Sequence, residues 1–488
     1  MGTPDYLIAL DIGTTSTKGM LYRMHGGAIA VTSSGYPQYY PDQGFVEQDP
    51  DEILNAVESV VNSLVQEHGV KPSSVAAVVY GSFLHSMLPV DKNGEPLTRA
   101  LIWADSRSTP QSERLRAELD VEEVKRRTGC TIHPLYFLPR LMWFRENAEE
   151  VLRKTDRFLS VKEYIIRRLH GESVVDRSIA SGTGVWNVTT LDWDQELLQH
   201  AGFDSDYFAP SVEPTYTLRG MTPHSASRLG LLDGTPGIIG ASDGPLAHLG
   251  STGLTADIMS LTVGTSGALR MSVDSPRIIP HQEAWCYYLA EHNWVLGAVC
   301  HDTGIVMNWF LHNFLKGQDF GDLNTLAGEV EAGSDGLLFF PFLGGEKSPH
   351  YNPSARGALL GMSFVHDVRH IVRALMEGIA YRLYANYRML DRSAATELAL
   401  TGGIRSSPVW MQITADFFGK NLKIPKTKEC AAWGAAIIGL RSLGILEALH
   451  DVGRLVEYGP SVEYNKETHS RYGKIYSHYK DMYRKIFQ

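Results

Sequence analysis

The alternation of apolar and polar positions near the start of the chain predicts a β-hairpin. An apolar run at residues 6–10 and another at residues 19–22 indicate two strands, and the polar residues 11–18 between them indicate the turn. Gly13 would let the backbone of this turn approach a ligand closely. The turn is either a solvated polar loop or a loop that binds phosphate, and this hairpin alone does not decide between them.

The side chains of the turn favour phosphate as the ligand. Hydroxyl groups and consecutive backbone N–H groups can donate to phosphate oxygens, and here the hydroxyls belong to Thr14, Thr15 and Ser16. Asp11 ends the first strand. Its carboxylate could hold a hydrated Mg²⁺ beside those oxygens, because Mg²⁺ keeps most of its waters and takes few carboxylates.

A second copy of the hairpin pattern lies in the other half of the chain. Residues 261–268 repeat the order of residues 10–17, with Gly264 and Thr265 in the turn, at an offset of 261 − 10 = 251 residues. A repeat at about half the chain length predicts two like-folded halves, which we place at residues 1–248 and 249–488. Two such hairpins facing each other would clamp a nucleotide triphosphate. Because Thr262 replaces Asp11, we expect only the first hairpin to hold the metal.

The rest of the hydrophobic pattern predicts strands alternating with helices, as in an α/β protein. A helix should open at Pro50 with Asp49 as its cap. Small residues at 241–249 and again at 431–439 predict a matching helix near the end of each half. The other expected elements are strands at 28–40, 75–80, 294–299 and 397–401 and helices over 111–170, 366–390 and 410–418.

Two segments that follow predicted strands carry candidate substrate-binding side chains. His85 follows the strand at 75–80, and Trp103, Asp105 and Arg107 follow another short strand. Trp103 could stack on a sugar face while Asp105 and Arg107 bind hydroxyl or carboxylate groups. The alternative is a structural histidine and an ordinary ion pair beside a core tryptophan, and the pattern leaves both open.

Asp243 is the candidate general base. It follows an apolar run and precedes Pro245, which is expected to begin a helix. In open α/β sheets the carboxyl end of a strand is where ligands bind. The alternative role is a helix cap, and one residue could serve both. Further along, the pair Gly402 and Gly403 follows a strand and would permit close approach of adenine or ribose, although a plain turn is its commoner role.

Composition and charge restrict the class of partner. The composition, 43% hydrophobic and 20% charged, is that of an ordinary globular protein, and a chain of 488 residues is too long for a single core. The net charge of −10 and the lack of a Lys/Arg-rich run argue against a nucleic-acid partner. No apolar run approaches the ~18 residues of a membrane span, and the chain enters a strand without a leader, so we expect a cytoplasmic enzyme. The four cysteines lack CxxC spacing and indicate neither disulfides nor a zinc site.

These motifs together resemble those of the FGGY family of sugar kinases, over essentially the whole chain. The matching segments are residues 11–18, 241–244, 263–266, 344–349, 356–362 and 401–407, in the family's order and spacing. The resemblance implies an α/β fold of two duplicated actin-like, ribonuclease-H-like domains, with ATP and sugar in the interdomain cleft. A nucleotide clamp of the actin or chaperone class is the alternative, and it would need no sugar site.

The resemblance also implies roles for individual residues. Asp243 would be the catalytic base and Asp11 the Mg²⁺ ligand. The implied ATP-binding residues are Gly13, Thr14, Thr15, Ser16, Lys18, Gly264, Thr265, Gly304, Gly402, Gly403 and Ser407. The implied substrate-binding residues are His85, Trp103, Asp105 and Arg107, together with Asp243.

Within the family, residues 85–87 and 102–107 are similar to those of gluconate kinases. This implies ATP-dependent phosphorylation of D-gluconate at its terminal hydroxyl, giving 6-phospho-D-gluconate. Kinases of xylulose, ribulose or another polyol are the alternatives. Arg140 stands where lysine is usual and Lys347 where arginine is usual, which bears on the sugar rather than on phosphoryl transfer. The expected partners are a sugar acid and ATP, without nucleic acid or membrane, and a homodimer remains an open option.

Overall fold

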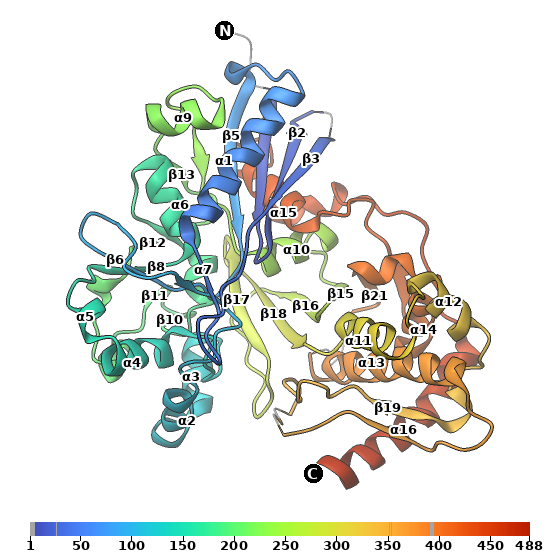
Figure 1. Cartoon of the computed structure of the whole chain (residues 1–488). Helices are drawn as coiled ribbons and strands as arrows, with labels where there is room; N and C mark the ends of the chain where they lie inside the picture. The colour runs from blue at the N-terminus through green and yellow to red at the C-terminus, as the bar shows by residue number, and fades with distance from the viewer. Residues whose placement is uncertain (1–4, 26, 351, 353, 391–394) are drawn as a thin grey trace.

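Two six-stranded sheets, one from each half of the sequence, form the framework of the molecule. The structure is a computed structural model, and it describes residues 5–25, 27–350, 352, 354–390 and 395–488. In Figure 1 the strands of the first sheet stand in the upper centre, and at the lower right lie the orange and red helices of the second half, α13 (Val368–Leu390), α14 (Pro408–Phe418) and α16 (Lys466–Phe487).

The first sheet joins an antiparallel meander to parallel strands, in the order β13-β14-β5-β1-β2-β3. β1 and β3 both run antiparallel to β2, whereas β5 pairs in parallel with β1 and with β14. The bounds are β1 Tyr6–Ile12, β2 Ser16–Arg23, β3 Gly27–Gly35, β5 Val75–Ser82, β13 Thr217–Leu218 and β14 Gly237–Ile238. The predicted hairpin and buried strand are therefore confirmed.

The second sheet repeats this plan, in the order β17-β18-β16-β15-β21-β22. The run β18-β16-β15-β21-β22 has the same strand directions as β3-β2-β1-β5-β14. The bounds are β15 Ile258–Val263, β16 Gly267–Val273, β17 Trp285–Ala290, β18 Asn293–Cys300, β21 Glu397–Thr401 and β22 Asn421–Lys423. The duplication predicted from the two hairpins is confirmed, and β13 and β17 are additional edge strands.

Two helices cross at the centre of the molecule. α15 (Cys430–Ser442) packs on β1 and β5 of the first sheet, and α10 (Asp243–Thr252) packs on β15 and β21 of the second. A Cβ atom on Gly434 would lie 2.0 Å from the carbonyl oxygen of Leu246, so only glycine fits there. The small-residue helices expected in each half are thus explained by this close crossing. The expected division after residue 248 falls inside α10.

Side-chain alternation on β1 gives the first sheet a core on each face. Ile8, Leu10 and Ile12 belong to the core shared with α1 (Pro50–Glu67), whereas Leu7 and Ala9 belong to the core shared with α15. α1 begins as predicted, because the side chain of Asp49 accepts a hydrogen bond from the N–H of Asp51 at 2.9 Å.

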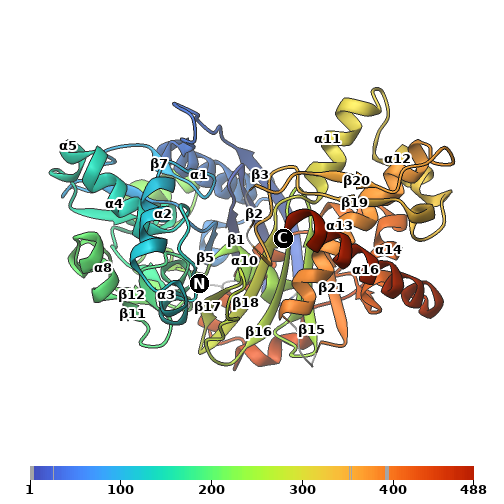
Figure 2. The ribbon, with the colours of Figure 1, turned by 90° about the horizontal axis from the view of Figure 1, so that it is seen from below.

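A mainly helical segment between β5 and β14 forms one side of the molecule, on the left in Figure 2. β8 interrupts the stretch 111–170, which was expected to be wholly helical. The elements are β6 Leu88–Val90, β7 Ala100–Leu101, α2 Thr109–Glu118, α3 Val121–Thr128, α4 Phe137–Asn147, α5 Glu149–Leu152, β8 Arg157–Leu159, α6 Val161–His170, β9 Val175–Asp176, α7 Arg177–Ser181, β10 Trp186–Asn187, β11 Asp192–Trp193, α8 Gln195–Ala201, β12 Ser211–Val212 and α9 Pro223–Leu229. A two-stranded ladder joins β7 to β4 (Glu47–Gln48).

The edge strand β17 links this segment to the second sheet. The N–H of Cys286 donates to the carbonyl oxygen of Gly129 at 2.9 Å, and the N–H of Tyr288 donates to Ser181 Oγ at 2.9 Å. The hydroxyls of Tyr136 and Tyr287 are 2.8 Å apart. Residues from both halves are therefore held side by side where the candidate site lies.

The outer helices of the second half cover the other face of its sheet. α13 packs on β16 and β18, and α16 packs on α14. The bounds are α11 Gly304–Phe314, α12 Phe320–Gly328, β19 Leu338–Phe340, β20 Ala358–Leu360, α13 Val368–Leu390, α14 Pro408–Phe418 and α16 Lys466–Phe487. All four cysteines are buried and free. None of the helices in the described residues is both long and apolar enough to cross a membrane.

Candidate active site

A cavity of about 200 Å³ lies between the two halves, where the predicted base and the first hairpin meet. We call it the interdomain cavity. Its first-half lining comes from the hairpin turn, the segment after β5, the loop before α4 and the start of α10. Its second-half lining comes from β16, β17, β18 and the loop after β19. The lining residues with polar or aromatic side chains are Thr14, Phe83, His85, Trp103, Thr131, His133, Tyr136, Asp243, Arg270, Glu283, Trp285, Tyr287, Lys347 and Ser348.

Asp243 is the first residue of α10 and lines the interdomain cavity. The helix begins at Asp243 rather than at Pro245, and the capping position expected of Asp243 belongs to Ser242. Asp243 Oδ1 accepts the N–H of Gly244 at 2.7 Å. Burial raises the pKa of Asp243, while the Gly244 N–H and the charge of Arg270 act in the opposite direction. A carboxylate with a raised pKa is better matched to proton transfer near neutral pH than an ordinary one.

Asp11 stands at the end of β1, beside Gly81 of β5. Burial, followed by the nearby charge of Asp243, raises the pKa of Asp11 to about 7, and Lys18 partly offsets this. Two carboxylates that repel each other would be stabilised by a divalent cation between or beside them. Within the described residues no group of three or more His, Cys, Asp or Glu side chains could hold a metal. A pair of carboxylates nevertheless fits Mg²⁺, which takes its remaining ligands from water and phosphate.

The turn of the first hairpin is tight and leaves its polar groups near the cavity. The N–H of Gly13 donates to the carbonyl oxygen of Ser16 at 3.0 Å, and that of Tyr36 donates to the carbonyl oxygen of Thr15. Thr14 lines the cavity itself. The ammonium of Lys18 is 2.7 Å from the carboxylate of Glu429 at the start of α15, so this lysine links the two halves.

The predicted nucleotide-binding residues of the second half come together around the second hairpin. The N–H of Gly304 donates to the carbonyl oxygen of Gly264 at 2.8 Å, and that of Ile305 donates to the carbonyl oxygen of Thr265. Gly402 has a φ of 91° and lies against the carbonyl oxygen of Val263. Three segments distant in sequence thus form one surface at the carboxyl ends of β15 and β21.

The glycine pair and Ser407 differ in what they offer to a ligand. A Cβ atom on Gly403 would meet nothing within 4 Å, so a flat group can approach this backbone. Ser407 caps α14, because its side chain accepts the N–H of Trp410 at 3.1 Å, and its hydroxyl also donates to Asn324. The hydroxyl of Ser407 is therefore used within the fold.

His85 lines the interdomain cavity as a neutral side chain. Its Nδ1 lies 2.9 Å from the carbonyl oxygen of Gly182, and because a carbonyl only accepts, Nδ1 carries the hydrogen. Burial, helped by the charges of Arg140 and Lys347 and opposed by that hydrogen bond, lowers the pKa of His85 to about 3. A protonated His85, which would pair with a carboxylate, is thus disfavoured, and Nε2 is left as a hydrogen-bond acceptor.

Trp103 is 41% exposed and lines the cavity. Its Nε1 donates to Thr14 Oγ1 at 3.1 Å, and its ring stacks on that of His301 with centroids 6.1 Å apart. The ring therefore bridges the first hairpin and the loop before α11.

Asp105 and Arg107, which were expected to bind substrate, are not among the residues that line the cavity. The guanidinium of Arg107 is 2.8 Å from Asp105 Oδ2 and 2.6 Å from Glu47 Oε1, and it stacks on the Phe45 ring. The side chains of Arg107 and Asp105 are only 5% and 0% exposed. Asp105 also accepts the N–H of Val46. Both residues therefore belong to a buried ion pair, which was the alternative to substrate binding.

Lys347 and Glu283 are cavity residues that the sequence reasoning did not select. Burial lowers the pKa of Lys347 to about 8, and the charge of Glu283 acts against this. Lys347 in turn lowers the pKa of His85, His133 and His301. It is thus a cation whose charge acts on all three imidazoles, and its place where arginine is usual was its signal in the sequence.

Arg270, on β16, is the other residue that was missed. Its Nη1 donates to Thr262 Oγ1 at 3.0 Å, its charge lowers the pKa of Asp243, and its buried Nε has no hydrogen-bond partner among the described residues. Thr262 is the residue that replaces Asp11 in the second hairpin. The second half therefore presents a cation where the first half presents a carboxylate.

Two family models match the chain. Residues 6–250 match the N-terminal domain of the FGGY family of carbohydrate kinases, and residues 259–443 match the C-terminal domain. The gluconokinase of Bacillus subtilis is 35% identical over 464 residues, which cover 92% of this chain and 90% of that protein.

Solved structures give the same result for the fold. The crystal structure of gluconate kinase from Lactobacillus acidophilus has a TM-score of 0.94 and 31% identity, covering 99% of this chain and 98% of that one. A ligand-bound xylulose kinase from the same organism has a TM-score of 0.95 and 31% identity with the same coverage. The predicted α/β fold of two duplicated actin-like domains agrees with these matches.

Proposed function

Because the chain belongs to the FGGY family of carbohydrate kinases, we propose that it transfers the γ-phosphoryl group of ATP to the terminal hydroxyl of D-gluconate. The similarity to the gluconokinase of Bacillus subtilis and to a gluconate kinase structure supports this substrate. The observation that carries the proposal is Lys347, a cation in the same cavity as the candidate base Asp243.

A sugar acid needs a positive group at one end and a base at the other. The charge of Glu283 raises the pKa of Lys347, whereas the charge of Arg270 lowers the pKa of Asp243. The two side chains thus have different charged neighbours within one cavity. Gluconate would place its carboxylate at Lys347 through a charge-assisted hydrogen bond. Its terminal hydroxyl would then face Asp243, and His85 Nε2 would accept a hydrogen bond from an intermediate hydroxyl.

Phosphoryl transfer follows from this placement. Asp243 accepts the proton of the terminal hydroxyl while that oxygen bonds to the γ-phosphorus and the bond to the ADP oxygen breaks in line. Arg270, whose buried Nε–H has no partner in the described part of the chain, donates to the oxygens of the phosphoryl group in transit. The remaining phosphate oxygens accept from the hairpin turns that contain Gly13 and Gly264, and Gly402 and Gly403 provide the surface for the nucleoside.

Mg²⁺ fits the first hairpin better than the second. Asp11 would hold it, with Asp243 as its neighbouring carboxylate, and the ion would neutralise charge on the phosphates. The second hairpin has Thr262 and Arg270 in the corresponding position, and a cation there would be repelled.

Xylulose phosphorylation is the second candidate, and the equal likeness to the xylulose kinase structure favours it. A neutral ketopentose has no carboxylate for Lys347. A nucleotide clamp without a sugar substrate is set aside, because the chain belongs to a family of carbohydrate kinases.

The position of the new phosphate tests the proposal. After incubation with ATP, Mg²⁺ and D-gluconate, the product should show one phosphorus resonance coupled to the two protons of C6. A phosphate at another carbon, or no transfer to gluconate while xylulose is phosphorylated, would overturn the proposed substrate.

A further inference from the structure

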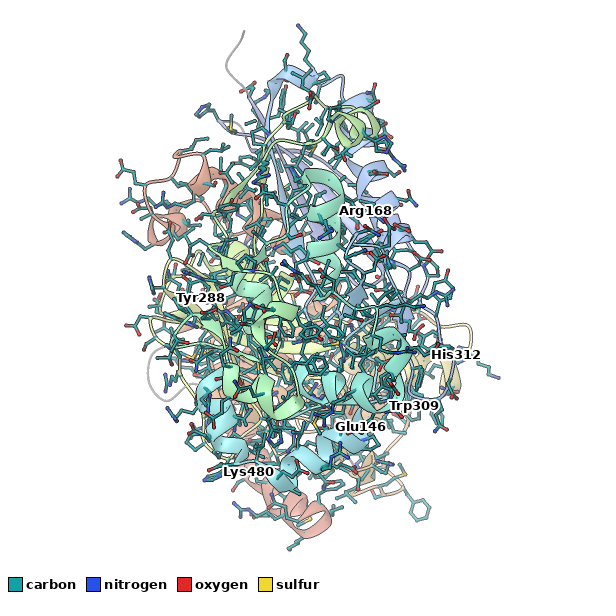
Figure 3. The ribbon with its side chains drawn as sticks, turned by 90° about the vertical axis from the view of Figure 1, so that its left-hand side faces the viewer. Glu146, Arg168, Tyr288, Trp309, His312 and Lys480 are labelled. Carbon is teal, nitrogen blue, oxygen red and sulfur yellow. The ribbon has the colours of Figure 1, made fainter. Side chains whose placement is uncertain are left out.

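A second cavity, of about 440 Å³, lies between α13, α16 and the loops at residues 279–282 and 346–350. We call it the α13–α16 cavity. α13 and α16 run near each other in Figure 1, and Lys480, one of the lining residues, is labelled low on the molecule in Figure 3. The volume of the cavity lies within the usual range for small-ligand sites.

Positive side chains dominate the lining of this cavity. Arg382, Arg388, Lys480 and Arg484 line it, against one acidic side chain, that of Glu346, and the last residue of the sequence, Gln488. The carboxylate of Glu346 is already engaged, since it is 2.9 Å from Arg382 Nη1 and accepts the hydroxyl of Tyr483. Because the whole chain has a net charge of −10, this excess of positive charge is local.

The cavity also contains donors that the fold leaves unused. Arg382 is only 3% exposed, and its Nε has no hydrogen-bond partner among the described residues. The ammonium of Lys480 lies over the ring of Tyr476, 5.2 Å from its centroid. In the described part of the chain neither Lys480 nor Arg388 forms an ion pair with a carboxylate. Guanidinium and ammonium groups together with tyrosine hydroxyls are the groups that bind phosphate in proteins.

Two short segments are shared between this cavity and the interdomain cavity. Gln282 lines the α13–α16 cavity, and the next residue, Glu283, lines the interdomain cavity. Glu346 and His350 likewise line the α13–α16 cavity, whereas Lys347, which lies between them in the sequence, lines the interdomain cavity. Two hydrogen bonds join these segments. The N–H of Glu283 donates to the carbonyl oxygen of Pro349, and Ser348 Oγ donates to the carbonyl oxygen of Glu283 at 2.7 Å. Glu283 and Lys347, which interact electrostatically, thus both lie on walls common to the two cavities.

We propose that the α13–α16 cavity binds a small phosphorylated sugar and that its occupancy changes the affinity of the interdomain cavity for the sugar acid. The phosphate binds Arg382, Arg388 and Lys480, and the sugar hydroxyls bind the tyrosine hydroxyls and Gln282. Binding draws Arg382 away from Glu346, which moves the segment that carries Lys347. The effect on the sugar acid rests on the proposed function, whereas the binding itself does not.

Titration calorimetry with 6-phospho-D-gluconate, and with inorganic phosphate as the comparison, tests the binding. Lys480→Glu reverses one charge in the cavity, and Lys474→Glu reverses one on the same helix outside it, because Lys474 lines a different surface hollow. Lys347→Met removes the cation of the interdomain cavity. We expect Lys480→Glu to raise the Kd of the α13–α16 cavity for 6-phospho-D-gluconate at least tenfold. Lys474→Glu and Lys347→Met should each still bind one equivalent there, with a Kd within twofold of the wild-type value. Tighter binding of the sugar phosphate than of phosphate would show that the sugar is recognised.

Several outcomes would overturn the inference. Loss of all binding in Lys347→Met with no effect of Lys480→Glu would place the ligand in the interdomain cavity alone. Equal effects of Lys480→Glu and Lys474→Glu would mean that only surface charge is sensed. For the coupling, we expect saturating sugar phosphate to change the KM for gluconate at least threefold more in the wild type than in Lys480→Glu, where only competition by the product in the interdomain cavity remains. An equal change of KM in the two proteins would overturn the coupling, and failure of the wild type to phosphorylate gluconate would overturn the proposed function instead.

Discussion

The carboxylate of Asp243, at the first position of α10, lies near enough to Asp11, at the end of β1, to help raise the pKa of Asp11 to about 7, after the larger effect of burial. The two acids come from opposite ends of the first half, and the sheet brings them together because β1 and the residue before α10 both flank β5. In our account Asp11 holds the metal and Asp243 takes the proton.

Replacing Asp243 by asparagine tests the base directly. Asp243→Asn keeps the size of the side chain but cannot accept a proton, so kcat should fall by about 10² or more while the Kd for ATP stays within about threefold. Steady-state kinetics and nucleotide titration measure both quantities. Asp120→Asn is the matched control, because Asp120 caps α3 and asparagine caps equally well. Near-normal turnover of Asp243→Asn would remove Asp243 from the mechanism.

The pH dependence of sugar binding tests Lys347. Burial lowers its pKa to about 8, so the ammonium is charged below that pH and becomes neutral above it. The KM for gluconate should therefore be flat below pH 8 and rise by about tenfold per pH unit above it. The KM for xylulose should not follow this curve, and Lys347→Met should abolish the rise. A flat profile for gluconate between pH 7 and 10 in the wild type would exclude Lys347 as the carboxylate ligand.

His85 is expected to act on the sugar and not on the nucleotide. His85 has a φ of 67°, which asparagine tolerates better than most residues, so His85→Asn is a milder test than alanine. Loss of the acceptor Nε2 should raise the KM for gluconate roughly three- to tenfold, as for one hydrogen bond. The KM for ATP should stay within twofold. Equal increases in both constants would indicate a general distortion of the cavity.

The crossing of α10 and α15 can be tested through stability. A methyl group on Gly434 would lie 2.0 Å from the carbonyl oxygen of Leu246. Gly434→Ala should therefore lower the free energy of unfolding by roughly 1–3 kcal/mol. Gly473→Ala is the control, because Gly473 lies inside α16 with nothing within 4 Å, and this change should stabilise by roughly 0.5–1 kcal/mol. Denaturation midpoints compare the two, and equal effects would refute the close crossing.

Much of the fold was predictable because its signals are local. The two hairpins, the Asp49 cap and the repeated small-residue helices are written in short runs of sequence, and all were found where expected. The strand β8 was missed because it pairs only with β6, far away in the sequence.

The candidate site was only partly predictable, because its charges come from separate loops. From the sequence, Arg107 was predicted to bind the substrate. Its ion-pair partner Glu47 lies on β4, far away in the sequence, so only the folded chain shows that pair. Arg270 carries no motif that distinguishes it from other basic residues, and Lys347 lies in the family-like segment 344–349 only as a replacement for the usual arginine. Their place in the site is recognised from the cavity they share with Asp243.

The relative kcat/KM of the wild-type enzyme for D-gluconate and D-xylulose, with ATP and Mg²⁺ at pH 7, tests the central claim most directly. Ribulose and glycerol complete the comparison. If Lys347 binds the carboxylate and Asp243 the terminal hydroxyl, gluconate should have the highest kcat/KM, and Lys347→Met should lower it at least tenfold without lowering that for xylulose. A higher kcat/KM for xylulose, ribulose or glycerol than for gluconate in the wild type would contradict the account.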